Sequence, residues 1–233
     1  MENLREKFII VLTGDEEEKV LYETLNKVKY LELRIDLFLK THTEDELIEW
    51  IKKVKRIGDN KIIGTLRWYK EAGEDYFYLS DKKRLDIYRQ ISDFVDIIDV
   101  EIKSNICDKV CEICKSKKKE IILSYHNFKK TPDINILKKI VKKGKKYQAN
   151  MIKIATKITT KKHLFTLIEF TYRYSKKTNL IVVPMGGNIY ERLIPLVFGS
   201  FFTYVHLNKK VAPCQPSYFE ISQFIDLMEP KMV

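Results

Sequence analysis

The sequence lacks several features that would have placed it in large classes of proteins. No segment approaches 18 consecutive apolar residues, so we expect no membrane-spanning helix. The apolar run at 8–12 is short and precedes no small-residue cleavage site, so it does not resemble a secretory signal. No Pro- or Ser-rich linker interrupts the chain. We therefore expect a single cytoplasmic domain over residues 1–233.

Two kinds of ligand-binding motif are also missing. The first strand-like segment is not followed by a Gly-rich phosphate loop, which argues against a doubly wound nucleotide-binding sheet. No cluster of His, Cys and Asp has the spacing of metal ligands. We therefore expect a site that uses neither a cofactor nor a metal ion.

Arginine is scarce in a strongly basic chain. The net charge is +11, yet only eight of the 43 basic residues are arginine. Proteins that read nucleic acids usually rely on arginine to bind bases and phosphates. The lysine runs fall at the ends and backs of predicted helices, where solvated lysine is ordinary. We expect no nucleic-acid partner, and a basic nucleic-acid-binding protein remains the non-enzymatic alternative.

Cysteine is limited to four residues, three of which form a Cys-x3-Cys-x2-Cys motif at 107–114. This spacing matches the iron–sulfur cluster motif of radical enzymes that cleave S-adenosylmethionine. It also places all three cysteines on one face of a helix. Cysteine is readily buried, so we favour a helix that packs these thiols against the core.

Strand-like and helical patterns alternate along the whole chain. Eight apolar segments begin near residues 8, 30, 61, 95, 120, 151, 180 and 201, and an amphipathic helical pattern follows each. Such alternation favours parallel pairing of the strands. Eight units in a chain of this length predict an α/β fold of the (β/α)8 TIM-barrel type, with outer helices. Active sites of such barrels lie at the carboxyl ends of the strands.

Polar residues interrupt the apolar strands near these ends. They are Glu32, Arg34 and Asp36, Arg67 and Glu71, Asp99 and Glu101, Ser124 and His126, and Lys153, with Arg192 opening a later helix. Burying so many charged groups is costly unless they bind something. Arginines suit an anionic small substrate, especially a carboxylate, and the acids suit hydroxyl groups.

Lys153 is the most informative of these residues because it lies between Ile152 and Ile154. Pointing inward, beside other cations, it would have a lowered pKa and could attack a ketone to form an iminium ion. The alternative is a structural lysine paired with a carboxylate such as Glu101. A nearby histidine, His126, suits proton removal next to the former carbonyl.

The other histidines are weaker candidates for a functional role. His42 and His163 lie at the starts of predicted helices and are expected to face solvent. His206 ends the eighth strand and could face either way.

The sequence resembles the type I 3-dehydroquinate dehydratases, which are Schiff-base enzymes of the shikimate pathway. The resemblance covers essentially the whole chain in order. It rests on the segments ELRID, TLRWYKEAGE, DVEI, SYHNFKKTP, IKIA, PMGG with a following ER, VFGSFFTY and APCQPS. Each segment is weak alone, but the ordered set is specific.

The resemblance implies a hydro-lyase that converts 3-dehydroquinate to 3-dehydroshikimate in aromatic amino acid and chorismate biosynthesis. It implies that Lys153 forms the imine, that His126 moves the protons and that Glu71 orients the histidine. Arg192 would bind the substrate carboxylate. Its hydroxyls would be held by Glu32, Arg34, Arg67 and Gln215. The family also implies a homodimer, with no cofactor.

Three positions depart from the family pattern. Glu191 stands where serine is usual, Val211 replaces a small polar residue, and Cys214 replaces a glycine. All three are expected in loops that close over the substrate, and the loop from Met185 to Arg192 looks one residue short.

The alternative enzyme is a class I Schiff-base aldolase, which would also use a lysine on the sixth strand. An aldolase should carry a phosphate site near the last two strands. Arg192 with Gln215 suits a carboxylate better than a phosphate.

Overall fold

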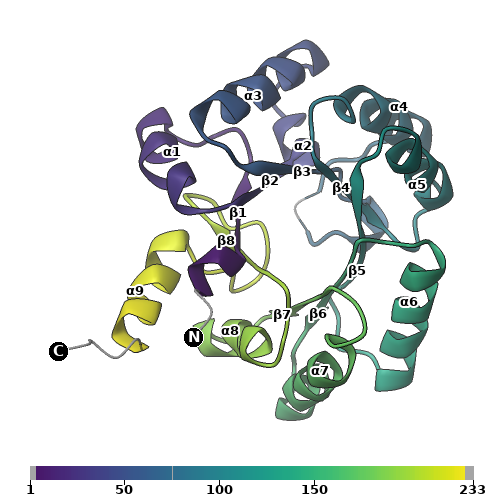
Figure 1. The fold of residues 1–233 in the computed structure, drawn as a ribbon, viewed down its shortest axis with the longest axis vertical. Coiled ribbons are helices and arrows are strands. Elements are labelled where there is room, and N and C mark those ends of the chain that lie inside the picture. Colours follow the sequence, from purple (N-terminus) through teal and green to yellow (C-terminus); the bar gives the residue numbers. More distant parts are fainter. Residues whose placement is uncertain (1–3, 75, 229–233) are drawn as a thin grey trace.

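The computed structural model describes residues 4–74 and 76–228, and its eight strands form one nearly closed parallel barrel (Figure 1). The order around the sheet is β7-β6-β5-β4-β3-β2-β1-β8, so neighbours in sequence are neighbours in space. The strands are β1 (Phe8–Leu12), β2 (Tyr30–Arg34), β3 (Lys61–Thr65), β4 (Ile97–Glu101), β5 (Glu120–Asn127), β6 (Met151–Lys157), β7 (Leu180–Met185) and β8 (Thr203–His206). The predicted (β/α)8 fold is confirmed.

Helices surround the barrel on its outside (Figure 1). The α-helices are α1 (Glu18–Thr24), α2 (Ile35–Phe38), α3 (Glu44–Ile57), α4 (Asp81–Ile91), α5 (Cys107–Ser116), α6 (Ile134–Lys146), α7 (Lys161–Tyr174), α8 (Ile189–Val197) and α9 (Tyr218–Met228). Short 3-10 turns are formed by Leu4–Lys7, Leu25–Lys27 and Tyr69–Glu71.

Several helices begin at residues whose side chains satisfy the first free backbone N–H groups. Thr43 accepts a hydrogen bond from the backbone of Glu46, whose carboxylate accepts one in return from the backbone of Thr43. Ser80 and Thr160 cap α4 and α7 in the same way with a single bond each. These caps fix where each helix leaves the barrel end that carries the polar residues.

Alternation along the strands divides the core into two layers. The larger layer lies between strands and helices and includes Ile10, Leu31 and Ile152. The smaller one fills the inside of the barrel with residues such as Ile9, Val11 and Ile181. Successive strand side chains point to opposite faces, so the period of two assigns each polar strand residue to the inside or the outside.

The predicted second strand was too long. It ends at Arg34, because Ile35–Phe38 turns into the helix α2. Asp36, which we expected near the end of the second strand with Glu32 and Arg34, therefore lies in a helix and not on the strand. β3 likewise ends at Thr65, so Arg67 lies in the loop beyond it.

The cysteine motif forms the predicted helix, α5. Cys107 and Cys114 are buried in the outer core layer, and Cys111 packs against it. A hydrogen bond with Cys111, together with burial, raises the pKa of Cys107, and burial raises that of Cys114 to about 12. The described residues contain no cluster of three or more His, Cys, Asp or Glu side chains able to hold a metal ion.

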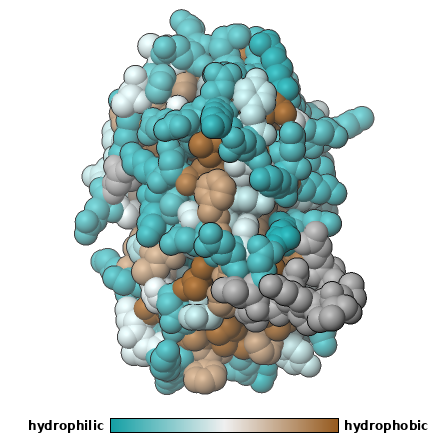
Figure 2. Space-filling model, turned by 90° about the vertical axis from the view of Figure 1, so that its left-hand side faces the viewer, coloured by the Kyte–Doolittle hydropathy of each residue, from teal (hydrophilic) through white to brown (hydrophobic). Residues whose placement is uncertain are grey.

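The face of the molecule over α1 and α9 is mostly hydrophilic, and hydrophobic residues gather in its lower part (Figure 2). Five exposed apolar side chains lie on α8, on α9 or between them, and we call this set the α8–α9 patch: Tyr190, Val197, Phe198, Phe201 and Phe219. Over the ranges that the structure covers, no helix has the length and apolar character needed to cross a bilayer.

Replacing Gly144 with alanine should destabilise the barrel. Gly144 is buried where α6 meets β6, and an added Cβ would lie 2.6 Å from Cδ1 and 2.8 Å from Cγ1 of Ile152. Alanine favours a helix over glycine by about 1 kcal/mol, but overpacking typically costs ~1–3 kcal/mol. Urea unfolding should show a net loss of about 1 kcal/mol for Gly144→Ala.

The matched control is Lys145→Ala, the neighbouring position on the exposed side of α6. It should change the free energy of unfolding by less than about 0.5 kcal/mol. A Gly144→Ala variant more stable than the parent would show that Ile152 moves aside at no cost.

Candidate active site

Seven of the eight residues to which the family resemblance assigns a role line one small cavity at the carboxyl ends of the strands. This inner cavity has a volume of about 50 Å³. Its polar lining consists of Glu32, Arg34, Arg67, His126, Lys153, Arg192, Gln215 and Tyr204. Its apolar lining consists of Val11, Phe128, Ala155, Val183, Met185, Val211 and Ala212. The eighth predicted residue, Glu71, lies behind His126.

Lys153 points into the barrel from β6 and is buried. Its Nζ donates to Oε1 of Glu32 at 3.1 Å and to Oδ2 of Asp99 at 3.0 Å. The same atom lies 3.8 Å from the ring centroid of Tyr204, close enough for a cation–π contact. The prediction of an inward lysine is therefore right, but its direct partners are two carboxylates rather than the other cations that the sequence suggested. Neither of them is Glu101.

Asp99 is tied to its neighbours through both carboxylate oxygens. Oδ1 accepts from the Ser124 hydroxyl at 2.5 Å, while Oδ2 faces Lys153. Burial alone would raise the pKa of Asp99, but the charges of Lys153 and Arg67 outweigh burial and hold it below the usual value. Asp99 is thus an anion next to the amine.

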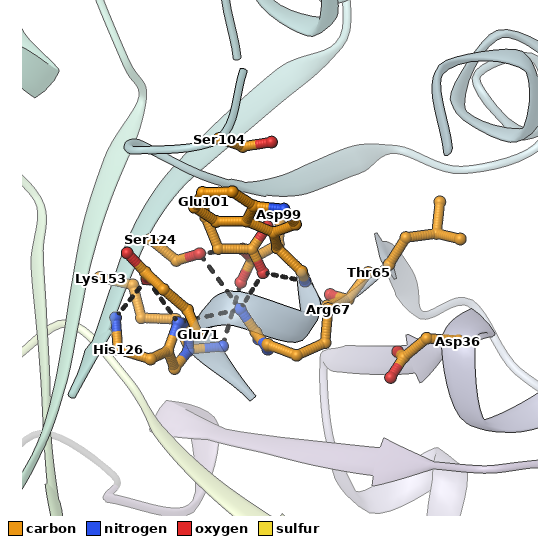
Figure 3. A network of polar contacts seen from close by, with 12 residues as sticks. Asp36, Thr65, Arg67, Glu71, Asp99, Glu101, Ser104, Ser124, His126 and Lys153 are labelled. Carbon is orange, nitrogen blue, oxygen red and sulfur yellow. Dashed lines mark hydrogen bonds and ion pairs between the residues drawn. The ribbon is translucent and has the colours of Figure 1, made fainter. Parts of the chain in front are cut away.

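His126 lies on β5 one strand away from Lys153 (Figure 3). Nη1 of Arg67 lies 3.0 Å from Nδ1 of His126. A guanidinium can only donate, so Nδ1 accepts and carries no proton. Burial, followed by the charges of Arg67, Lys153 and Arg34, puts the pKa of His126 well below its usual value. The imidazole is therefore neutral near pH 7, with its hydrogen on Nε2.

Glu71 supports the histidine from behind. Its Oε2 accepts a hydrogen bond of 2.7 Å from the backbone N–H of His126 and lies 3.6 Å from Nδ1. Oε1 is buried and has no hydrogen-bond partner among the described residues. Burial, with a smaller contribution from Glu101, raises the pKa of Glu71 to about 7. Glu71 thus contacts the histidine mainly through the backbone.

Arg67 is held by the fully buried Glu101. Oε1 of Glu101 accepts from Nη1 of Arg67 at 2.7 Å and from the backbone N–H of Trp68 at 2.9 Å. Oε2 accepts from Nη2 of Arg84, on α4, at 2.8 Å. Figure 3 shows Arg67 at the centre of these contacts, between the acids and His126. The position of Arg67 therefore depends on a carboxylate and a second arginine that both lie outside the cavity lining.

The two remaining arginines of the cavity differ in their partners. Arg34 forms a two-pronged ion pair with Asp36, through distances of 2.9 Å and 2.6 Å. Arg192 has no ion pair with any described residue: its Nη1 donates to the backbone oxygen of Pro184 at 2.8 Å, and its buried Nε has no partner. Burial lowers the pKa of Arg192 to about 10. A buried, unpaired guanidinium is a ready site for a ligand carboxylate.

The residues that depart from the family pattern take different places. Glu191 completes a capping box with Asn188 at the start of α8 and pairs with Lys161. Val211 lines the inner cavity, and its N–H donates to Oε1 of Gln215 at 3.0 Å. Cys214 is exposed with φ 54°, a left-handed conformation that favours glycine. Only Val211 therefore changes the cavity wall directly.

The remaining histidines lie away from the inner cavity. His42 stacks on Phe38, with ring centroids 4.1 Å apart, and His163 bonds with Thr159 at the start of α7. We expected both histidines to face solvent, but both are half-buried. His206 is buried, and neither ring nitrogen has a hydrogen-bond partner among the described residues.

The sequence missed several groups that complete the site. Tyr204 covers Lys153. In the sequence, only its position in an apolar strand could have pointed to it. Arg84 is one of many charged residues on a helix, so nothing in its spacing marks it as buried. Asp99 and Ser124 were noted as strand residues without a role.

The arrangement suits one kind of chemistry. It brings an amine, a neutral imidazole and an unpaired guanidinium into one small cavity among carboxylates. An amine can attack a carbonyl, the imidazole can take a proton, and the guanidinium can bind a carboxylate. A small keto acid with hydroxyl groups fits these groups together.

The chain is similar to proteins of known family. The family model described as type I 3-dehydroquinase matches residues 8–232. A 3-dehydroquinate dehydratase of Thermodesulfovibrio yellowstonii is 33% identical over 207 residues, which cover 88% of each chain. One of Pyrococcus abyssi is 33% identical over 218 residues, covering 88% of this chain and 93% of that protein.

Solved structures agree with these relatives. A crystal structure of the type I 3-dehydroquinate dehydratase of Clostridium difficile, with covalently modified comenic acid, has a TM-score of 0.81. It is 26% identical and covers 97% of this chain and 93% of that one. The Aquifex aeolicus 3-dehydroquinate dehydratase is also 26% identical and has a TM-score of 0.80. The match covers 96% of this chain and 99% of that one. The family match runs over nearly the whole chain, and the chain therefore belongs to the type I 3-dehydroquinase family.

Proposed function

We propose that this type I 3-dehydroquinase removes water from 3-dehydroquinate through an imine on Lys153, giving 3-dehydroshikimate. The observation that carries the proposal is the position of the Lys153 amine, inside the cavity and one strand from a neutral His126. Family membership supplies the hydro-lyase activity. The roles below follow from the contacts of each residue.

The reaction begins when the Lys153 amine attacks the substrate ketone and the carbinolamine loses water to give an iminium ion. The ammonium form must first lose a proton, and Glu32 and Asp99, at 3.1 Å and 3.0 Å, are within reach to accept it. The iminium ion draws electrons from the adjacent carbon, so the C–H bond there becomes acidic. Covalent attachment thus replaces one difficult elimination by easier steps.

His126 then moves the protons. Its neutral ring can accept the proton from the carbon next to the iminium ion, which leaves an enamine. The enamine expels the neighbouring hydroxyl group, and the imidazolium returns its proton to make water. Hydrolysis of the remaining imine releases the product and the free Lys153 amine. Arg67, bonded to Nδ1, keeps the ring in the tautomer that this sequence of transfers starts from.

The substrate's fixed charge would bind at Arg192. This guanidinium is buried without an ion pair, and a bound carboxylate would supply the missing negative charge. Gln215 lies in the same wall, while Glu32, Arg34 and Arg67 line the rest of the cavity and would hold the hydroxyl groups. No phosphate is needed to satisfy this set, which favours a dehydratase over an aldolase.

We also propose a homodimer in the cytoplasm without a nucleic-acid partner. All four cysteines are free thiols, as in a reducing compartment. The basic excess is mostly lysine, which suits solvated helix faces better than base recognition. The α8–α9 patch exposes between 40% and 75% of each of its five apolar side chains, as a subunit interface would.

Borohydride reduction should trap the substrate on Lys153. Incubation with 3-dehydroquinate and sodium borohydride should add the mass of the reduced product imine to the peptide that contains Lys153. Lys153→Ala should lose this adduct and lower kcat at least ~1000-fold, because the described cavity lining contains no other amine. Mass spectrometry and the ultraviolet absorbance of the enone product provide the two measurements.

Two variants serve as controls for the trapping experiment. Lys162→Ala, on the exposed face of α7, should keep both the adduct and the turnover. His126→Ala should still be trapped on Lys153, now as the heavier reduced substrate imine, and should lower kcat by about 100- to 10,000-fold, because proton transfer is lost while the amine remains. Dehydratase activity in Lys153→Ala would contradict the imine mechanism.

Glu71 should make the fold less stable as the pH rises. Its pKa is about 7 in the folded chain against 4.5 in a free side chain, so between these values the folded state holds a proton that the unfolded state releases. The free energy of unfolding should fall by roughly 2–3 kcal/mol from pH 4.5 to pH 7 through this group and then level off. In Glu71→Gln this contribution should vanish, while the amide oxygen still accepts from His126.

Urea unfolding at several pH values measures this difference between the parent and Glu71→Gln. Only the pH-dependent part of the difference counts, because the substitution also has a constant effect on stability. An equal pH dependence in both proteins would contradict the raised pKa of Glu71.

Val197→Asp should break the proposed dimer. Val197 is the most exposed member of the α8–α9 patch, at 75%, and a buried charge opposes association. Sedimentation at micromolar concentration should show a dimer for the parent and a monomer for the variant. Tyr22→Asp, on exposed α1, should remain dimeric. A parent that sediments as a monomer would contradict the proposal.

A further inference from the structure

A second, larger cavity opens directly above the inner one. This outer cavity has a volume of about 520 Å³. Five residues line both cavities: Arg34, Arg67, Phe128, Val211 and Ala212. The outer cavity is therefore continuous with the candidate active site rather than a separate surface feature. None of the roles assigned above uses it.

Four cations surround the outer cavity. Arg34 and Arg67 belong to its deeper end, because they also line the inner cavity. Lys157, at the end of β6, and Lys210, in the loop after β8, contribute exposed side chains. Neither lysine forms an ion pair with a described residue, although Lys210 lies near enough to Glu220 to lower the pKa of that carboxyl. Of the described lining residues, Glu74 alone is acidic.

The inner cavity is small for the substrate. Its volume of about 50 Å³ has room for only a few water molecules, not for a six-membered ring that carries a carboxylate and hydroxyl groups. The apolar residues shared by the two cavities, Phe128, Val211 and Ala212, form the neck between them. The ring of Phe128 packs against Gly73, where an added Cβ would lie 3.2 Å from Cε1. A ligand that enters from the outer cavity passes this neck on its way to Lys153.

We propose that the outer cavity is an anion-binding antechamber in which Lys157 and Lys210 hold the substrate carboxylate before the substrate passes the neck. The inference rests on the proposed function, because it takes the anionic substrate from there. The two lysines attract the anion at the rim, and Arg192, whose guanidinium has no ion pair with a described residue, binds it in the inner cavity. Glu74 opposes capture and helps the anionic product to leave.

Electrostatics determines what such a site can do. One unit charge several ångströms from another, in water at low ionic strength, changes the local concentration of a ligand by about 2-fold. Two lysines therefore give about 3- to 5-fold, and salt screens the effect over a Debye length of about 8–10 Å. The antechamber should thus raise kcat/KM at low salt and leave kcat unchanged, because neither lysine contacts the reacting atoms.

The test compares three variants in steady-state assays with 3-dehydroquinate. In the double variant Lys157→Gln with Lys210→Gln, kcat/KM should fall about 3- to 5-fold at ~10 mM ionic strength. Glu74→Gln should raise it about 2-fold under the same conditions. In both variants kcat should stay at the parent value, and both differences should disappear near 0.5 M salt, where the Debye length is only ~4 Å.

A charge-matched control separates the antechamber from the overall basic charge. Lys142→Gln with Lys145→Gln removes two exposed lysines from α6, whose carboxyl end lies at the opposite end of the barrel. This control lowers the net charge as much as Lys157→Gln with Lys210→Gln does. It should nevertheless leave kcat/KM nearly unchanged. Equal losses in the two double variants would overturn the proposal, as would a loss that persists at high salt. An inactive parent would refute the proposed function instead, so the two failures are distinguishable.

Discussion

One buried carboxylate, Glu101, holds the site together. It is fully buried, and it accepts hydrogen bonds from Arg67, the backbone of Trp68 and Arg84. These contacts link β4, the loop after β3 and helix α4. Breaking a buried pair of this kind by removing one partner typically costs about 3–5 kcal/mol, because the other charge is left without compensation. The loop that carries Arg67 and Glu71 is therefore as firmly placed as the strands.

The protonation states of the site follow from this anchor. Glu101 holds Arg67 in place, Arg67 donates to Nδ1 of His126, and the histidine therefore stays neutral with its proton on Nε2. On the other side, Lys153 is balanced by Glu32 and Asp99. The cavity thus holds the His126 imidazole uncharged and the Lys153 amine between two carboxylates. Arg192 is left as the buried cation that needs a ligand.

The sequence predicted the barrel and most of the cavity because both depend on a period of two. Lys153 lies between two isoleucines, so once β6 is recognised the lysine must face inward if its neighbours pack against helices. The same argument placed His126. The argument failed at Asp36, because the chain leaves the strand after Arg34 and enters α2. Beyond the strand, side chains no longer alternate between the two faces. Arg84 and Tyr204 could not be found either, since their roles depend on which residues the fold brings opposite them.

The backbone bond from His126 to Glu71 was also beyond the sequence. The family resemblance gave Glu71 the task of orienting the histidine, and this role remains a proposal. Its closest contact, at 2.7 Å, is to the main chain of His126, while the ring lies 3.6 Å away. A side chain that binds the main chain can be located only when two segments 55 residues apart are seen together.

The capping box at the start of α8 has a consequence for how this chain can vary in evolution. Asn188 and Glu191 fix the first turn of the helix, and Arg192 follows in the next position, where it reaches the Pro184 oxygen. The direction of Arg192 is therefore set by the helix start and not by the length of the preceding loop. Residues before Asn188 can be gained or lost without turning the guanidinium away from the cavity. A single insertion between Asn188 and Arg192 would rotate it by about 100° around the helix axis.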